Sequence, residues 1–400
     1  MSTTSPSARV AVEGAFKAQT LVAFVVALLV YLVSSGFKRT VYDAYALMAN
    51  GWLNGHLWIL NPGPAVDAVL VNGHYYIIEA PLPGLLMLPF VAALGARASQ
   101  EFVCVICAAI AVAAIDVVAG RLGIARGRRL ALLAFFALGT AMWWCTAFGA
   151  VWMFAGISAA MFVALALAEW YGHRRPWLVG LLVMAAALCR LPAILALLPL
   201  AWWLWADDRA ASSKRLAWLA AGVAPLLLAY FVYNYLRYDT IADVGYTAWY
   251  HHDLVGQPEG SPFRLQYLPF NLYSFLLLAP EYARQFPWVH LSGFGVSLTL
   301  TSPALVLALA ADWRSKETRA LWAALVLVAV PSLLYYVNGF EQFGMRHSLD
   351  FVAFTVPLVA RGITRVPRAL WVPLVAYSVA ANAFGVWYSW AYHAYAVVPT

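Results

Sequence analysis

Three residues of this sequence could carry out or support acid–base chemistry at a membrane boundary. Asp43 lies between Tyr42 and Tyr45, directly after the first long apolar run, and Arg190 and Arg346 lie beside two later apolar runs. A carboxylate in such a place can act as a general base that removes a proton from a hydroxyl or an amine. Arginine binds phosphate through paired donors, so both arginines are candidates for holding a phosphate or pyrophosphate.

Each of these residues also has a structural interpretation. Asp43 can cap the N-terminus of a short interfacial helix expected at 44–53, which would contribute about 1 kcal/mol. The arginines can form ion pairs with Asp43, Glu341 or Asp350 that hold helices together. Both interpretations stay open for Asp43. A bare arginine in an apolar span is costly unless it faces water or an anion. Phosphate binding is favoured for the arginines, because two such residues are expected to face the same side.

Further polar and aromatic side chains near the expected outer surface are candidates for contacting a substrate. The run His251-His252-Asp253 suggests a metal site, but adjacent histidines do not share a helix face and no third spaced ligand is evident. We therefore expect no certain cofactor, and a divalent metal is not favoured. The candidate substrate-binding residues are Tyr42, Tyr45, Glu79, Tyr246, His252, Glu341, Gln342, His347 and Asp350.

The composition indicates that membrane-spanning helices position these residues. The chain has 400 residues, of which 64% are hydrophobic and 11% charged, and its mean hydropathy is +0.75. A soluble core cannot bury that much apolar surface, so we predict a polytopic membrane protein. The net charge of +7 comes from basic residues scattered among short loops. That pattern favours membrane topology over nucleic-acid binding.

The distribution of Lys and Arg predicts which segments lie outside. The run 81–95 is short and holds three prolines, so we expect it not to cross the membrane. With the N-terminus in the cytoplasm, most of the 25 basic residues then fall in inner loops, as the positive-inside rule requires. This predicts one all-α domain, 1–400, with about 11 transmembrane helices. Its outer loops are about 37–100, 237–290 and 338–350, and the first carries interfacial helices.

This layout, together with several short motifs, resembles the GT-C superfamily of membrane glycosyltransferases. The motifs are Tyr42-Asp43-Ala44-Tyr45, Gly73-His74-Tyr75-Tyr76, Glu79-Ala80-Pro81-Leu82-Pro83, Cys189-Arg190-Leu191-Pro192, Tyr233-Asn234 through Gly245-Tyr246, and Phe343-Gly344-Met345-Arg346-His347. Members take a sugar from a polyprenyl-phosphate carrier at the extracytoplasmic face. The resemblance implies a multi-pass protein of the bacterial inner (plasma) membrane. Its partners would be a polyprenyl-phosphate-linked sugar, the lipid bilayer, and a glycan, lipid or protein acceptor, without nucleic acid.

The resemblance also implies roles for individual residues. Asp43 takes the place of the catalytic base in an inverting transfer, while Arg190 and Arg346 stabilise the departing phosphate. Many relatives carry a second acid in the next outer loop, but here that segment, 147–152, has none. A single-acid mechanism without metal therefore fits better, although Glu79, Glu341 or Asp350 could substitute in space.

A transporter or flippase of a lipid-linked or anionic substrate is the main alternative. The break in the apolar runs around Arg190 is typical of carriers, as are charges within apolar segments. A non-catalytic membrane scaffold is a third interpretation. The sequence has no internal repeat, and its charges concentrate on one face. Both features favour the enzyme.

Overall fold

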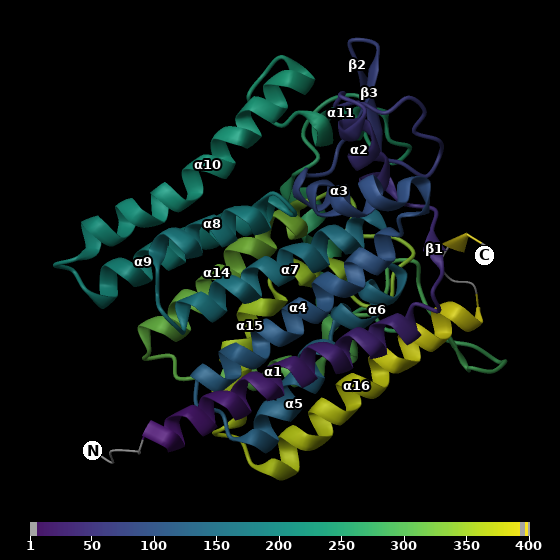
Figure 1. Cartoon of the computed structure of the whole chain (residues 1–400). Coiled ribbons are helices and arrows are strands. Elements are labelled where there is room, and N and C mark those ends of the chain that lie inside the picture. Colours follow the sequence, from purple (N-terminus) through teal and green to yellow (C-terminus); the bar gives the residue numbers. More distant parts are fainter. Residues whose placement is uncertain (1–5, 393–396, 399–400) are drawn as a thin grey trace.

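The structure is a computed structural model that describes residues 6–392 and 397–398. The chain forms a bundle of helices with roughly parallel axes, and the short strands gather at one end of it (Figure 1). This mostly helical architecture confirms the predicted fold class. The end of the bundle that carries α2, α3 and the strand pair β2–β3 is called the outer end below.

Six helices among the described residues are long and apolar enough to cross a membrane. A further pair of helices, bent by 46° at a short break, could form a seventh span. Thr140 begins the second helix of this pair by accepting a hydrogen bond from the Met142 backbone NH at 3.2 Å. The six helices are α1 (Pro6–Ser34), α4 (Gln100–Arg121), α7 (Val151–Trp170), α10 (Ser212–Tyr238), α14 (Lys316–Leu334) and α16 (Arg368–Ala391), and the bent pair is α5 (Arg126–Leu138) with α6 (Ala141–Phe148).

Four shorter apolar helical segments occur among the described residues. Three lie in predicted spans, and the first lies in 81–95, which was expected not to cross the membrane. The four are α3 (Leu82–Leu94), α8 (Pro176–Ala187), η2 (Leu191–Ala196) continued by α9 (Leu197–Asp207), and α15 (Val352–Ile363). Each of these is shorter than the ~20 residues that a spanning helix needs. The total of about 11 spans therefore stays a prediction, with six or seven supported by helix length and composition.

The outer end is built from short helices and hairpins. The turn Asn72-Gly73 joins β2 to β3, and both of its residues have positive φ, which suits a tight two-residue hairpin. The elements in this group are β1 (Arg39–Thr40), α2 (Ala44–Leu53), β2 (Ala68–Val71), β3 (His74–Ile77), η1 (Gly95–Arg97), α11 (Gly245–His252), η3 (Leu265–Tyr267), α12 (Leu268–Leu276), β4 (Glu281–Tyr282), β5 (Val289–His290), α13 (Leu298–Thr301), η5 (Arg346–Asp350) and β6 (Val397–Val398). The 3₁₀ helix η4 (Pro303–Ala310) extends α13 into the bundle.

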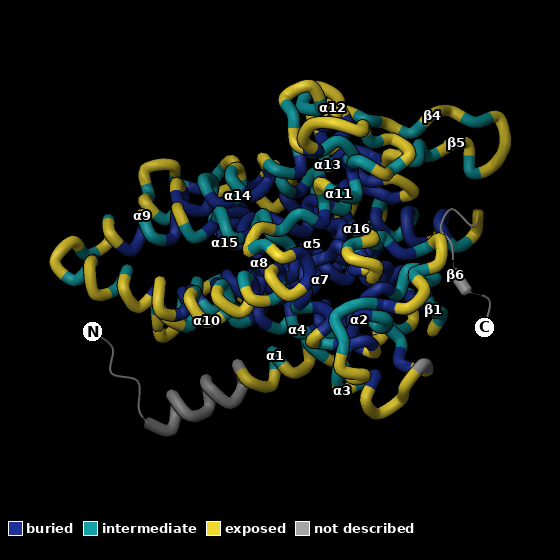
Figure 2. The backbone as a smooth tube through the Cα atoms, turned by 90° about the horizontal axis from the view of Figure 1, so that it is seen from above, coloured by how far each residue is buried: buried dark blue, intermediate teal, exposed yellow. Residues whose placement is uncertain are grey.

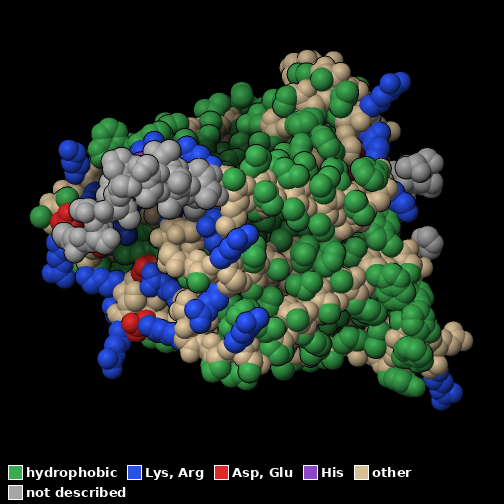
Figure 3. All heavy atoms as spheres, turned by 60° about the horizontal axis from the view of Figure 1, so that its bottom comes forward, with side chains coloured by type: hydrophobic (Ala, Val, Ile, Leu, Met, Phe, Trp, Pro, Cys, Tyr) green, Lys and Arg blue, Asp and Glu red, His purple; other side chains and the backbone are tan. Residues whose placement is uncertain are grey.

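The core lies along α4 and α7. In their most apolar stretches, 72% and 83% of the residues are buried, whereas in those of α1 and α10 only 11% and 17% are buried. Figure 2 shows this difference, with buried backbone in the centre and exposed backbone along α10. Hydrophobic side chains cover a broad band of the surface in Figure 3, and Lys and Arg side chains gather toward its ends. Such a band is what a lipid bilayer requires of the helices that face it.

Candidate active site

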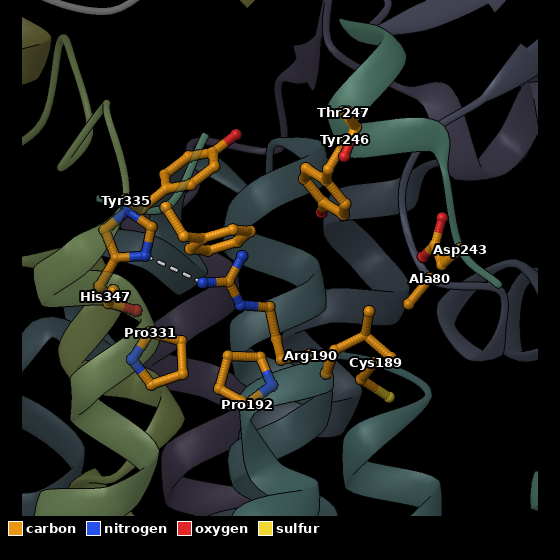
Figure 4. A pocket seen from close by; sticks show the side chains of 13 residues that line it. Ala80, Cys189, Arg190, Pro192, Asp243, Tyr246, Thr247, Pro331, Tyr335 and His347 are labelled. Carbon is orange, nitrogen blue, oxygen red and sulfur yellow. Dashed lines mark hydrogen bonds between the residues drawn. The ribbon is translucent and has the colours of Figure 1, made fainter. Parts of the chain in front are cut away.

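Two adjoining cavities lie among the outer segments. The larger has a volume of about 250 Å³ and the smaller about 170 Å³. They share four lining residues, which are Arg190, Tyr246, Tyr335 and His347. Arg190, Tyr246 and His347 are among the residues predicted from the sequence, whereas Tyr335 is not, and the four come from segments far apart in the chain. The fold therefore brings α11, the start of η2, the end of α14 and η5 around one space (Figure 4).

Arg190 is held by a bidentate ion pair with Asp350. Its Nε donates to Oδ1 at 2.9 Å and its Nη2 to Oδ2 at 3.0 Å. The Asp350 side chain is 1% exposed and that of Arg190 16%, and the Ser332 hydroxyl adds a longer bond to Oδ2 at 3.3 Å. The ion pair neutralises part of the positive charge of Arg190, which was predicted to bind phosphate. Arg190 thus links the start of η2 to η5 through an ion pair, which was one of the alternatives for this residue.

His347 lies against the same guanidinium. Arg190 Nη2 is 2.9 Å from His347 Nδ1. Burial lowers the pKa of His347 well below its ordinary value, and the positive charges of Arg190 and Arg346 lower it further. The ring is therefore neutral at physiological pH, and it lines both cavities.

Arg346 and Asp67 both contact the indole ring of Trp152. Its guanidinium lies 5.0 Å from the centre of the Trp152 ring, and its Nη1 donates to the Phe340 carbonyl at 3.3 Å. The indole Nε1 of Trp152 donates to Asp67 Oδ2 at 2.9 Å. Tyr42 packs against the same indole ring, with its ring centre 5.1 Å from that of Trp152. The larger cavity is lined by all five of these residues, which are Tyr42, Asp67, Trp152, Phe340 and Arg346.

Asp67 was not selected from the sequence, yet it is an acid of the cavity wall. Burial raises its pKa above the ordinary value, and nearby Asp253 raises it too, while the Trp152 hydrogen bond and Arg346 act in the opposite direction. A buried carboxyl with a raised pKa is suited to accept a proton near neutral pH. Asp253, which also lines the cavity, accepts a hydrogen bond from the Tyr336 hydroxyl.

A search of protein-family models found no match, and no curated protein matches the sequence. Among solved structures, the chain resembles a crystal structure of ArnT from Cupriavidus metallidurans bound to undecaprenyl phosphate. The TM-score is 0.54 at 16% sequence identity, and the match covers 88% of this chain. The chain shares the fold of ArnT. This likeness confirms the predicted polytopic helical fold. The chain spans 62% of the length of that protein.

Asp43, the predicted base, lies at the edge of this region. It stands at the N-cap position of α2, but its side chain makes no capping hydrogen bond, and it does not line either cavity. Burial raises its pKa, whereas a hydrogen bond to its own backbone and the charge of Arg39 lower it. Its part in catalysis stays a prediction, and Asp67 occupies the position in the cavity wall that had been expected of Asp43.

Glu79 and Tyr45 form a buried group behind the wall. Glu79 is 2% exposed, and neither carboxyl oxygen has a hydrogen-bond partner among the described residues; the same holds for the Tyr45 hydroxyl. Burial raises the pKa of Glu79 well above its ordinary value, and the charge of Asp67 raises it further, while Arg190 and Arg237 lower it. Glu79 therefore resists ionisation more than an ordinary glutamate does.

The remaining predicted residues divide between the cavity and its surroundings. Glu341 lines the larger cavity. Gln342 does not line it, and instead binds the carbonyls of Phe294 and Asn338, both at 3.1 Å, which fixes the loop before η5. His252 is exposed at the end of α11 and lines neither cavity. Within the described part of the chain, no three His, Cys, Asp or Glu residues are grouped closely enough to hold a metal ion.

Proposed function

We propose that this protein is a membrane glycosyltransferase that moves a sugar from a polyprenyl-phosphate donor to an acceptor outside the membrane. The observation that carries the proposal is the larger cavity, where Arg346 and Asp67 contact the same Trp152 side chain. A cation that can hold a phosphate and an acid that can take a proton are thereby placed in one enclosed space. The ArnT-like fold supports this assignment, since the matched structure contains undecaprenyl phosphate.

The proposed reaction is a single displacement with inversion at the anomeric carbon. The acceptor oxygen or nitrogen forms a bond to that carbon while the bond to the phosphate oxygen breaks. Asp67 receives the proton of the acceptor, and the electron pair of the broken bond leaves on the polyprenyl phosphate. Arg346 stabilises that charge as it develops. Arg190 contributes less directly, because Asp350 already balances much of its charge.

The aromatic walls suit a sugar ring, and the smaller cavity suits the start of the prenyl tail. Tyr246, Trp249, Tyr335 and Tyr336 line the larger cavity and offer faces on which a sugar can lie. The smaller cavity is lined on one side by Leu191, Pro192, Phe263 and Pro331, which give an apolar route toward the bilayer. The protein would then lie in a bacterial inner membrane, with its N-terminus in the cytoplasm and the cavities on the outer side.

The test is the binding of undecaprenyl phosphate to the purified protein, followed by profiling of lipid-linked sugars in the native host. Arg346→Ala is expected to weaken binding about 10- to 100-fold, because it removes a charge-assisted hydrogen bond of about 1.5–3 kcal/mol. Arg284→Ala, which removes an exposed arginine from the loop between β4 and β5, is the matched control and should bind normally.

In the host, deletion of the protein should remove one glycoconjugate and cause its lipid-linked sugar to accumulate. Equal binding by Arg346→Ala and the wild type would refute the phosphate site. Movement of the lipid-linked sugar across vesicle membranes by the wild type, without transfer to any acceptor, would show a flippase instead.

A further inference from the structure

Asp350, Arg190 and His347 form a chain of hydrogen bonds that ends in the cavity. Asp350 and His347 both come from η5, whereas Arg190 comes from the segment between α8 and η2. The carboxylate holds two donors of the guanidinium, at 2.9 and 3.0 Å, and the guanidinium Nη2 lies 2.9 Å from His347 Nδ1. Figure 4 shows the imidazole ring beside the guanidinium, with this contact drawn as a dashed line.

The contact determines where the imidazole carries its proton. A guanidinium has only N–H donors and no acceptor. A hydrogen bond from Arg190 Nη2 therefore requires a lone pair on His347 Nδ1. Because the ring is buried between two arginines, it is neutral, and a neutral imidazole has one N–H. That hydrogen is consequently on Nε2.

The Nε2–H group has no acceptor among the residues that the structure describes. His347 is 7% exposed, and its Nε2 is buried without a hydrogen-bond partner among the described residues. A buried donor without a partner costs about 1–3 kcal/mol. Since the ring lines both cavities, an acceptor atom of a bound molecule can satisfy this group. Arg190 and Arg346 both place positive charge near the ring, so an anionic oxygen is the acceptor that fits best.

We propose that His347 Nε2–H donates a hydrogen bond to a phosphate oxygen of the lipid-linked donor, and that Arg190 and Asp350 position it by fixing this tautomer. The proposal rests on the proposed function for the identity of the anion. It assigns Arg190 and Arg346 different tasks: Arg346 supplies charge to the phosphate, and Arg190 orients a neutral donor. Such a donor adds directional binding without a further charge that would have to be desolvated.

The first measurement is the tautomer itself, by NMR of the full-length protein in detergent with ¹⁵N-labelled histidine. His347→Gln identifies the signals by their loss. The expected result is a single neutral state with the hydrogen on Nε2, in the absence of any ligand. A hydrogen on Nδ1, a charged ring or a mixture of tautomers would overturn the positioning role of Arg190 and Asp350.

Two substitutions at residue 347 then separate the two edges of the ring. The amide nitrogen of Gln can reach the position of Nε2 and keeps a donor in the cavity, whereas Asn reaches only the position of Nδ1 and keeps the acceptor for Arg190. With undecaprenyl phosphate as the probe, His347→Gln should bind within about threefold of the wild type. His347→Asn should bind about 10- to 100-fold more weakly, as expected for one hydrogen bond to a charged group.

The outcomes distinguish this inference from the proposed function. If the wild type binds undecaprenyl phosphate and both variants bind equally well, the contact with His347 is refuted and the phosphate site stands. If both variants lose binding equally, the donor at the Nε2 position is not what the phosphate requires, and the proposed hydrogen bond is refuted. If the wild type fails to bind undecaprenyl phosphate or inorganic phosphate, both the donor assignment and the phosphate contact fall. The NMR measurement would still decide the tautomer in that case.

Discussion

The choice between Asp67 and Asp43 as general base can be decided by their asparagine variants. Asp67→Asn keeps the size of the side chain and an acceptor for the Trp152 indole, so the 2.9 Å contact can survive while the basic carboxylate is lost. General bases contribute about 10²- to 10⁴-fold to the rate. We therefore expect kcat of Asp67→Asn to fall by about that factor, with binding of undecaprenyl phosphate within a few-fold of the wild type.

The pH dependence gives a second, independent measure of the same residue. Burial raises the pKa of Asp67, so its carboxyl group stays protonated, and inactive as a base, up to a higher pH than an ordinary aspartate. The rate of the wild type should rise with pH as this group ionises, and the pH of half-maximal rate should lie above the ordinary value of about 3.9. Asp67→Asn should lose this step, because an amide does not titrate.

The assay is transfer of sugar from a lipid-linked donor by purified protein in detergent or vesicles, across a range of pH. Asp239→Asn is the matched control: it removes an exposed acid of the outer segments that contacts Asn72, and asparagine tolerates its positive φ. Full activity in Asp67→Asn, together with a loss of 100-fold or more in Asp43→Asn, would refute our assignment and restore the sequence-based candidate.

Three further substitutions test the packing around the site. Asp350→Asn leaves Arg190 as a buried cation without its counter-charge, so the unfolding free energy should fall by about 3–5 kcal/mol, seen as a lower melting temperature in detergent. Glu79→Gln removes a carboxyl group that resists ionisation in the folded protein. Because the pKa of this group is raised on folding, the wild type loses stability as pH rises, whereas an amide does not titrate. The melting temperature of the variant minus that of the wild type should therefore increase between about pH 5 and pH 8. Gly362→Ala would place a methyl group 1.7 Å from a backbone oxygen of η4 and should destabilise the protein by about 1–3 kcal/mol, whereas Gly127→Ala meets open space and should be neutral or slightly stabilising. Each argument has an outcome that would contradict it. For Gly362→Ala this is a wild-type melting temperature, and for Asp350→Asn it is only a small change in melting temperature. For Glu79→Gln it is a difference in melting temperature from the wild type that stays constant across pH.

The membrane class of the fold could be predicted from composition and from the positions of Lys and Arg, because both follow from the free energy of burying side chains in lipid. The exclusion of 81–95 from the predicted spans used the same reasoning, and the structure has α3 as a 13-residue helix. Gly84 of α3 lies so close to Met48 of α2 that an added Cβ would be 2.7 Å from its sulfur atom. Close packing of this kind depends on both helices and leaves no pattern in either one.

The site was predicted less completely, since it depends on contacts between distant segments. Asp67 and Asp43 lie in the same predicted outer loop, and only the path of the β2–β3 hairpin and the bond from Trp152 place Asp67 in the cavity. At the end of α11, His252 points to solvent while the next residue, Asp253, lines the cavity. No sequence periodicity could separate these neighbours. The pairing of Arg190 with Asp350 was among the alternatives, and only the geometry of η5 decides it.

The long separation between Arg190 and Asp350 has a consequence for how the chain is made. The two residues lie 160 positions apart, so at 5–20 residues per second Arg190 leaves the ribosome roughly 8–30 s before its partner is synthesised. During that interval Arg190 lacks the carboxylate that pairs with it in the folded protein, and a bare arginine is costly in lipid unless it contacts water, headgroups or another anion. The ion pair that fixes the segment between α8 and η2 therefore forms only after η5 has been synthesised, so this part of the cavity wall is completed late.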